Sequence, residues 1–145
     1  MQKYFQMQKL YFEPTDLTPE INFSPDENIF AIRGISSPED VRALYYPVID
    51  WIRTFVDDII EGSVKVFHKD SPVRMHVDLS YFNSSSAKFL FDIFTELKRL
   101  KSSEVPVIVE WMYEAEDNDM KEAGSDIADL VDMEFNYISK PGMKQ

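Results

Sequence analysis

The clearest hydrophobic pattern in the chain is a strict alternation over residues 73–81. Successive side chains of a strand point to opposite faces of a sheet, so this pattern predicts a central strand with one covered face and one face in water. The polar positions are Arg74, His76, Asp78 and Ser80, and the apolar positions are Val73, Met75, Val77, Leu79 and Tyr81.

Three other stretches repeat their apolar residues every three or four positions, which predicts helices. The first is expected to begin with Ser37 as N-cap and Pro38 at its first position, and to end at Gly62. Pro47 lies inside it and predicts a bend. The other two helices are expected over residues 84–100 and 119–132.

Short apolar runs between turn residues predict the remaining strands. Residues 21–23 and 29–33 flank a turn that contains Pro25, which is typical of a hairpin. Two more strands are expected over 105–113 and 134–138. The order β β α β α β α β requires parallel neighbours joined by right-handed crossovers. We therefore predict an α/β fold, a mixed sheet of four or five strands with three helices covering one face.

Length and composition point to one domain over residues 1–145, with residues 1–10 as a loosely ordered or edge-strand N-terminus. The chain has no cysteine, which excludes thiol catalysis and cysteine zinc sites and fits a reducing compartment. Residues 1–10 hold no apolar stretch of signal-peptide length, and charges or prolines interrupt every apolar run before it could span a bilayer. We expect a cytoplasmic protein.

The formal net charge is −11, from 26 acidic and 15 basic residues. Such a surface repels phosphate backbones and anionic lipids, so neither nucleic acid nor a membrane is an expected partner. A protein partner with a basic or apolar docking surface is easier to accommodate. Solubility alone also accounts for this acidity.

The most informative stretch for chemistry is residues 78–88, where the central strand ends and a helix begins. It places three consecutive hydroxyls, Ser84, Ser85 and Ser86, directly after Asn83. Ligands of open α/β sheets gather at the carboxyl ends of strands, and a helix N-terminus offers unpaired amides and a partial positive charge. A phosphoryl group is well placed there. Helix capping by Asn83 or Ser84 explains one of these polar residues, and explains the set less well.

Enzymatic readings find less support. His76 and Asp78 share a strand face with Cα atoms roughly 6.5–7 Å apart, which does not make a nucleophile relay, and the chain has no Gly-x-Ser-x-Gly elbow. His76, Asp78 and Glu110 are better explained as a solvated polar face than as a metal site. The acids from Glu114 to Asp119 lack the glycine and terminal glutamate of a calcium loop. We predict no catalytic residue, metal or cofactor.

The predicted element order, with hydroxyls at the tip of the central strand, resembles the STAS domains of anti-sigma-factor antagonists. In that family an Asp-Ser-Ser-Gly turn carries a regulatory phosphoserine, and residues 83–86 occupy the equivalent place without the glycine. A closer resemblance, from about Phe12 to Ile138, is to the SiaC family of bacterial regulatory phosphoproteins. The matching pieces are Thr18-Pro19-Glu20, Ser37-Pro38-Glu39, Tyr46-Pro47 with Trp51, residues 78–86, and Glu110 to Glu114 leading to Asp117, Asp119-Met120 and Gly124.

The resemblance implies a cytoplasmic adaptor that a dedicated Ser/Thr kinase phosphorylates and a PP2C-type phosphatase restores. The unphosphorylated form is then expected to bind and activate a diguanylate cyclase, which makes the biofilm signal cyclic di-GMP. The phosphoacceptor aligns with Ser84, where the family often has threonine, and Ser85 is a competing acceptor. Expected partner contacts are Tyr81, Phe82, Asn83, Ser85 and Ser86.

An alternative from a different class is a constitutive protein-binding scaffold without phosphorylation, or a partner switch of the anti-sigma-factor-antagonist type without a cyclase. Its support is the aromatic content. Tyr46 and Trp51 fall off the apolar stripe of the first helix, and Phe82 and Phe89 flank the serines. Such residues can anchor a partner, although core packing also accounts for each of them.

Overall fold

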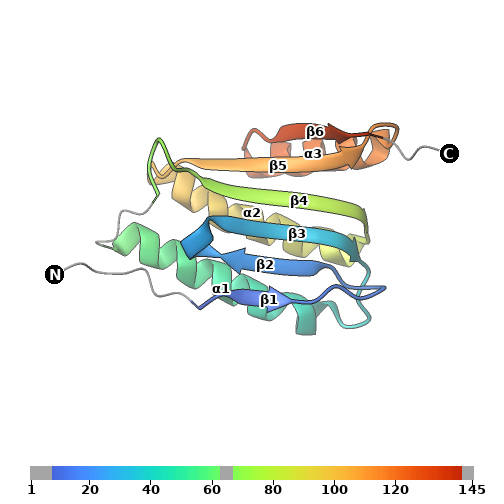
Figure 1. The fold of residues 1–145 in the computed structure, drawn as a ribbon, viewed down its shortest axis with the longest axis horizontal. Helices are drawn as coiled ribbons and strands as arrows, with labels where there is room; N and C mark the ends of the chain where they lie inside the picture. Colours follow the sequence, from blue (N-terminus) through green and yellow to red (C-terminus); the bar gives the residue numbers. More distant parts are fainter. Residues whose placement is uncertain (1–7, 63–66, 142–145) are drawn as a thin grey trace.

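The computed structural model of the protein describes residues 8–62 and 67–141. Within these residues one sheet of six strands is backed by three helices (Figure 1). The strands β1 to β3 pair antiparallel and β3 to β6 pair parallel. They cross the sheet in chain order: β1 (Leu10–Phe12), β2 (Glu20–Ser24), β3 (Ile29–Ser36), β4 (Val73–Phe82), β5 (Val107–Glu114) and β6 (Asn136–Lys140).

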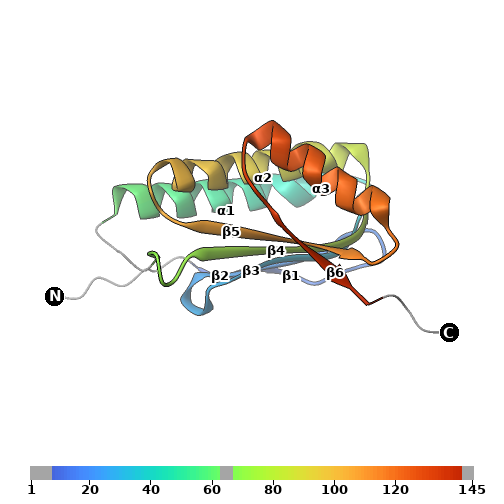
Figure 2. The same ribbon diagram turned by 90° about the horizontal axis from the view of Figure 1, so that it is seen from above.

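Each helix connects two neighbouring parallel strands. They are α1 (Val41–Glu61), α2 (Ser84–Ser102) and α3 (Asn118–Val131). Because the crossovers are right-handed and the strand order advances in one direction, successive helices fall on the same face of the sheet. All three lie on one side of it (Figure 2). This confirms the predicted fold class, and α2, α3, β5 and β6 begin and end within two residues of their predicted bounds.

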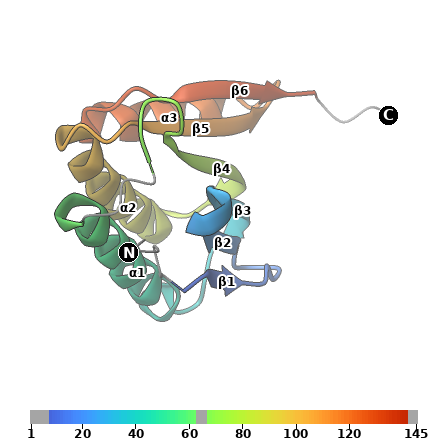
Figure 3. The same ribbon diagram turned by 60° about the vertical axis from the view of Figure 1, so that its left-hand side comes forward.

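The strand count exceeds the prediction of four or five, because β1 adds an edge strand to the hairpin of β2 and β3. Figure 3 shows β1 at the sheet edge beside α1, opposite β6. β1 has only three residues, which are too few to show the alternating hydrophobic pattern of a strand. It is recognised by its pairing with β2. Just before it, the Gln8 carbonyl accepts a hydrogen bond from the Trp51 indole of α1 at 2.7 Å. The expectation for residues 1–7 lies outside the described residues.

Helix α1 begins later than predicted. Its N-cap is Asp40, whose carboxylate accepts from the Ala43 amide at 3.1 Å, and not Ser37. The Ser37 amide instead donates to the Leu17 carbonyl at 2.7 Å. Pro38 favours an extended conformation at the residue before it, and that conformation suits this tertiary bond. The predicted helix end at Gly62 is confirmed.

Helix α3 approaches the sheet closely at Gly124. A Cβ at this position would lie 2.6 Å from ring atoms of the fully buried Trp111 on β5. The Trp111 indole in turn donates to the Met120 carbonyl at 2.9 Å, and Asp117 caps the helix. Four of the pieces that carry the family resemblance therefore dock this helix on the sheet.

Candidate functional site at the start of helix α2

A β-bulge precedes the junction between β4 and α2. The register between β3 and β4 shifts at Gly34/Ile35, so that Leu79 pairs with Gly34 but Tyr81 pairs with Ile35. Gly34 has φ +114°, a conformation that favours glycine. Ser80 is the extra residue of the bulge, and its hydroxyl donates to the Gly34 carbonyl at 3.3 Å.

The bulge reverses the alternation of β4 at its end. Tyr81 was predicted on the covered face, but it is 52% exposed. Phe82 turns instead toward the helix layer and meets Trp111 edge-on, with ring centroids 6.1 Å apart. One extra residue moves every later side chain to the other face, which is the physical reason for this correction.

Helix α2 begins immediately after β4, with Asn83 as the N-cap. The Asn83 side-chain oxygen accepts from the Ser86 amide at 2.9 Å and from the Ser85 hydroxyl at 3.2 Å. Ser84 is the first residue of the helix and is exposed, as is Ser85. Among the described residues, the Ser84 hydroxyl has no hydrogen-bond partner, so it is the less constrained of the two exposed hydroxyls.

The third serine belongs to a buried hydroxyl network. Ser36, Tyr45 and Ser86 are each 0% exposed. The Ser86 hydroxyl donates to the Ser36 carbonyl at 3.0 Å and accepts from the Ser36 hydroxyl at 2.8 Å. The Ser36 hydroxyl has one proton, which it donates to Ser86. The Tyr45 hydroxyl is therefore the donor in the 2.7 Å contact between Tyr45 and Ser36. Ser86 was predicted as a partner contact, but its hydroxyl is sealed in the core.

This network fixes the start of α2 to two other elements, β3 through Ser36 and α1 through Tyr45. The Ser36 carbonyl also accepts from the Asn83 amide at 3.0 Å. Burial raises the pKa of the Tyr45 phenol. The sequence offered no signal for Ser36 or Tyr45, because a serine at a strand end and a tyrosine on an apolar stripe are ordinary residues.

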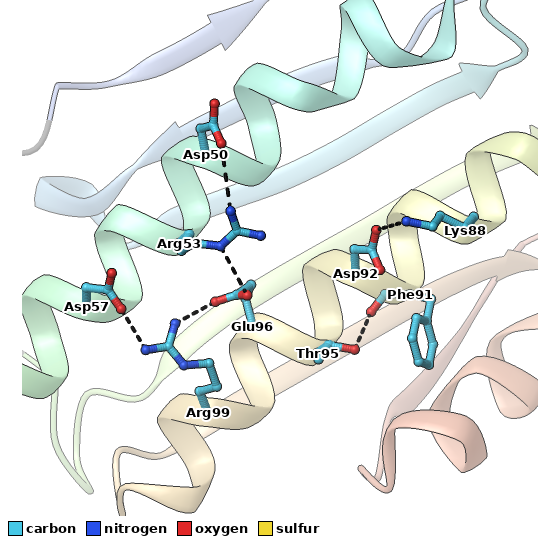
Figure 4. A network of polar contacts seen from close by, with 9 residues as sticks. All are labelled: Asp50, Arg53, Asp57, Lys88, Phe91, Asp92, Thr95, Glu96 and Arg99. Carbon is cyan, nitrogen blue, oxygen red and sulfur yellow. Dashed lines mark hydrogen bonds and ion pairs between the residues drawn. The ribbon is translucent and has the colours of Figure 1, made fainter.

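A groove of about 310 Å³ lies between α1 and α2, and its lining on α2 begins at Lys88, four residues after Ser84. Phe89 is almost buried at its base, stacked on Tyr45, while Tyr46 is 53% exposed and meets the Phe89 ring at 5.9 Å. Lys88 pairs with Asp92 at 2.7 Å on the α2 side, and Asp50 and Arg53 line the α1 side (Figure 4). Phe89 thus packs in the core, as the sequence allowed, while Tyr46 remains open to a partner.

The polar residues on the open face of the sheet form ion pairs. The Asp78 carboxylate lies 2.6 Å from the Lys140 amine, and Glu110 contacts His76 at 3.4 Å and Arg74 at 3.8 Å. In the described part of the chain, no group of three histidines or acids is arranged to hold a metal ion. This face therefore has the geometry of a charge-paired sheet surface.

Comparison with known proteins places the chain in a family. Residues 12–140 match the model of the SiaC family regulatory phosphoproteins, so the chain belongs to that family. The chain is 29% identical to an uncharacterised protein of Pseudomonas aeruginosa (strain UCBPP-PA14) over 108 residues, which are 74% of this chain and 78% of that protein.

Two solved structures are similar over nearly their whole lengths. Apo-SiaC from Pseudomonas aeruginosa has a TM-score of 0.72 and 25% identity, covering 92% of this chain and 99% of that one. SiaC in the complex of the diguanylate cyclase SiaD with its activator SiaC, from the same species, has a TM-score of 0.74 and 25% identity, covering 91% and 98%. The second structure shows a SiaC protein bound to an enzyme as its activator, so partner binding is the activity of a solved relative.

None of the helices in the described ranges has the length and apolar character needed to cross a membrane.

Proposed function

We propose that this protein is a cytoplasmic signalling adaptor that acts by binding and not by catalysis, and that phosphorylation of Ser84 switches the binding off. The observation that carries the proposal is the exposed hydroxyl at the first position of α2, in a chain that belongs to a family of regulatory phosphoproteins. By analogy with SiaC, the unphosphorylated form binds and activates a diguanylate cyclase, and so controls cyclic di-GMP and biofilm formation.

The modification is a phosphoryl transfer from ATP. The Ser84 oxygen forms a bond to the γ-phosphorus, the bond between the γ-phosphorus and the bridging oxygen of ADP breaks, and the hydroxyl proton passes to a base of the kinase. The free Ser84 hydroxyl favours this serine over Ser85, whose hydroxyl already donates to Asn83. The first-turn amides and the helix dipole stabilise the dianion that results. A PP2C-type phosphatase removes it.

The expected size of the switch follows from electrostatics. Phosphorylation adds about −1.5 to −2 charges. One unit charge facing a partner acid at about 4 Å costs about 4 kcal/mol at an effective dielectric of 20, which lowers affinity several hundredfold. The surface beside Ser84 offers Tyr81, Asn83 and Ser85 to that partner, while Phe82 packs on Trp111, so the exposed Tyr81 is the main apolar contact.

The proposal is tested with the cognate kinase and ATP. Wild type is expected to gain one phosphate by intact mass, Ser84→Ala to gain none, and the matched variant Ser85→Ala to gain one. A phosphate mapped by mass spectrometry to another residue would disprove the assignment of Ser84.

Partner binding is tested by calorimetry with the diguanylate cyclase of the same organism. Wild type is expected to bind, and Ser84→Asp to bind more weakly with an unchanged circular dichroism spectrum. Equal binding by both, and by enzymatically phosphorylated protein, would favour the constitutive scaffold, for which the exposed Tyr46 and Tyr81 are the supporting observation.

A further inference from the structure

The surface between α1 and α2 carries a row of ion pairs, with Lys88 and Asp92 at one end of it (Figure 4). Arg99 contacts Asp57 and Glu96 at 2.6 Å each, and Arg53 contacts Glu96 at 3.5 Å and Asp50 at 3.9 Å. These arginines are therefore each shared between two acids. Lys88 is the cation of the row nearest the serines, and among the described residues it pairs with one acid, Asp92.

Lys88 lies about one helical turn from each of two residues of α2, one before it and one after it. Asp92 is four residues after it, and Ser84 is four residues before it. Side chains four apart on a helix are neighbours, with Cβ atoms about 5–6 Å apart. The Lys88 side chain is 67% exposed, so it can turn toward either neighbour, and its ammonium has three donors.

We infer that Lys88 is the intramolecular phosphate ligand of this protein: it pairs with Asp92 when Ser84 is free and with the phosphoryl group when Ser84 is modified. This inference rests on the proposed function and specifies how the same site is regulated. Two physical reasons favour the exchange. The phosphoryl dianion carries more charge than a carboxylate, and an acid four residues before a lysine pairs better than one four residues after it.

The exchange has a consequence for the groove between α1 and α2. Lys88 and Asp92 both line it, facing Asp50 and Arg53 of α1. When Lys88 turns to the phosphate, Asp92 loses its cation, and the rim of the groove becomes more acidic. Phosphorylation then alters the surface over Phe89 as well as the end of the helix.

The test uses full-length protein with phosphoserine installed at position 84 by genetic encoding, so no kinase or partner is needed. The second pKa of the phosphate is measured by ³¹P NMR titration. A cation beside the dianion lowers this pKa, so Lys88→Gln is expected to raise it by about 0.2–0.4 pH units, which is the energy of a helical ion pair expressed as a titration shift. Lys88→Arg is expected to keep the wild-type value.

Two further variants separate the exchange from general charge effects. Lys101→Gln removes the same charge from the far end of α2, about 25 Å from Ser84, and is expected to leave the phosphate pKa unchanged. Asp92→Asn removes the competing acid and is expected to lower it. A Lys88→Gln value equal to wild type or to Lys101→Gln would overturn the role of Lys88, and an unchanged value in Asp92→Asn would overturn the exchange. If the kinase assay fails while these shifts appear, only the proposed function is lost.

Discussion

The junctions at the carboxyl ends of β3 and β4 both connect a parallel strand to a helix, but they differ in length and in the residues of the first helical turn. In both, an Asx side chain accepts from the amide three residues later. Between β3 and α1 the chain takes four residues, and the first turn of α1 presents Val41, Arg42 and Ala43. Between β4 and α2 only Asn83 intervenes, and the first turn presents three serines.

The difference separates the cap of α2 from the exposed serines that follow it. A cap is needed at both helix starts and is supplied at both, so it does not explain Ser84 and Ser85. The two junctions are also joined, because Ser36 at the end of β3 bonds Ser86 of α2 and Tyr45 of α1. The buried hydrogen-bond network of Ser36, Tyr45 and Ser86 therefore holds the helix turn that carries the exposed serines, and it includes residues of the neighbouring junction.

The largest effect on stability is expected from removing the hydroxyl that joins the junctions. Ser36→Ala leaves the buried Tyr45 hydroxyl without its acceptor, which is expected to cost about 2 kcal/mol of unfolding free energy. Urea unfolding measures this loss. Ser80→Ala, which removes an exposed hydroxyl at the bulge, is the matched control, and equal stabilities of the two variants would show that the network does not support the site.

The pH dependence of stability reports on the same network. Because burial raises the pKa of Tyr45 above its ordinary value of 10.0, the unfolded chain releases this proton first as pH rises. The contribution is therefore complete below pH 10 and lost as the pH rises toward the folded pKa, with a slope of up to about 1.4 kcal/mol per pH unit. Unfolding between pH 9 and 11.5 is expected to show a flatter decline in Tyr45→Phe than in wild type or in Tyr46→Phe. If the stability of all three proteins declined in parallel with pH, the contribution of the Tyr45 phenol to the pH dependence would be disproved.

Removing each cap compares the junctions directly. Asn83→Ala and Asp40→Ala are each expected to cost about 1 kcal/mol, measured by thermal unfolding. Only Asn83→Ala is expected to slow phosphorylation of Ser84, because it frays the turn that presents the acceptor. A similar slowing in Asp40→Ala would mean that overall stability, and not local order, governs recognition by the kinase.

The smallest effect is expected at the neighbouring serine. Ser85→Ala removes an exposed hydroxyl whose one bond is to the Asn83 side chain, so its stability is expected to stay within about 0.5 kcal/mol of wild type. Chemical denaturation checks this value. A loss above 1 kcal/mol would assign Ser85 to the cap and not to the exposed surface.

Local patterns in the sequence were enough to predict the class of fold and to place the candidate site at a helix start. Strand and helix periods are local and strong in β4, α1, α2 and α3, and the alternation of strands and helices leaves few ways to build a sheet. The serine cluster after Asn83 could likewise be located at a helix start from residue types alone.

Contacts between distant segments set the features that no local pattern predicts. β1 exists through its pairing with β2, α1 starts at Val41 because the Ser37 amide bonds Leu17, and the bulge beside Gly34 turns Tyr81 outward and Phe82 inward. The tertiary structure also divided three adjacent serines into two that face solvent and one, Ser86, that is sealed against Ser36. The physical reason is common to all of these: hydrogen bonds between residues distant in sequence outweigh preferences of neighbouring residues that differ by about 1 kcal/mol.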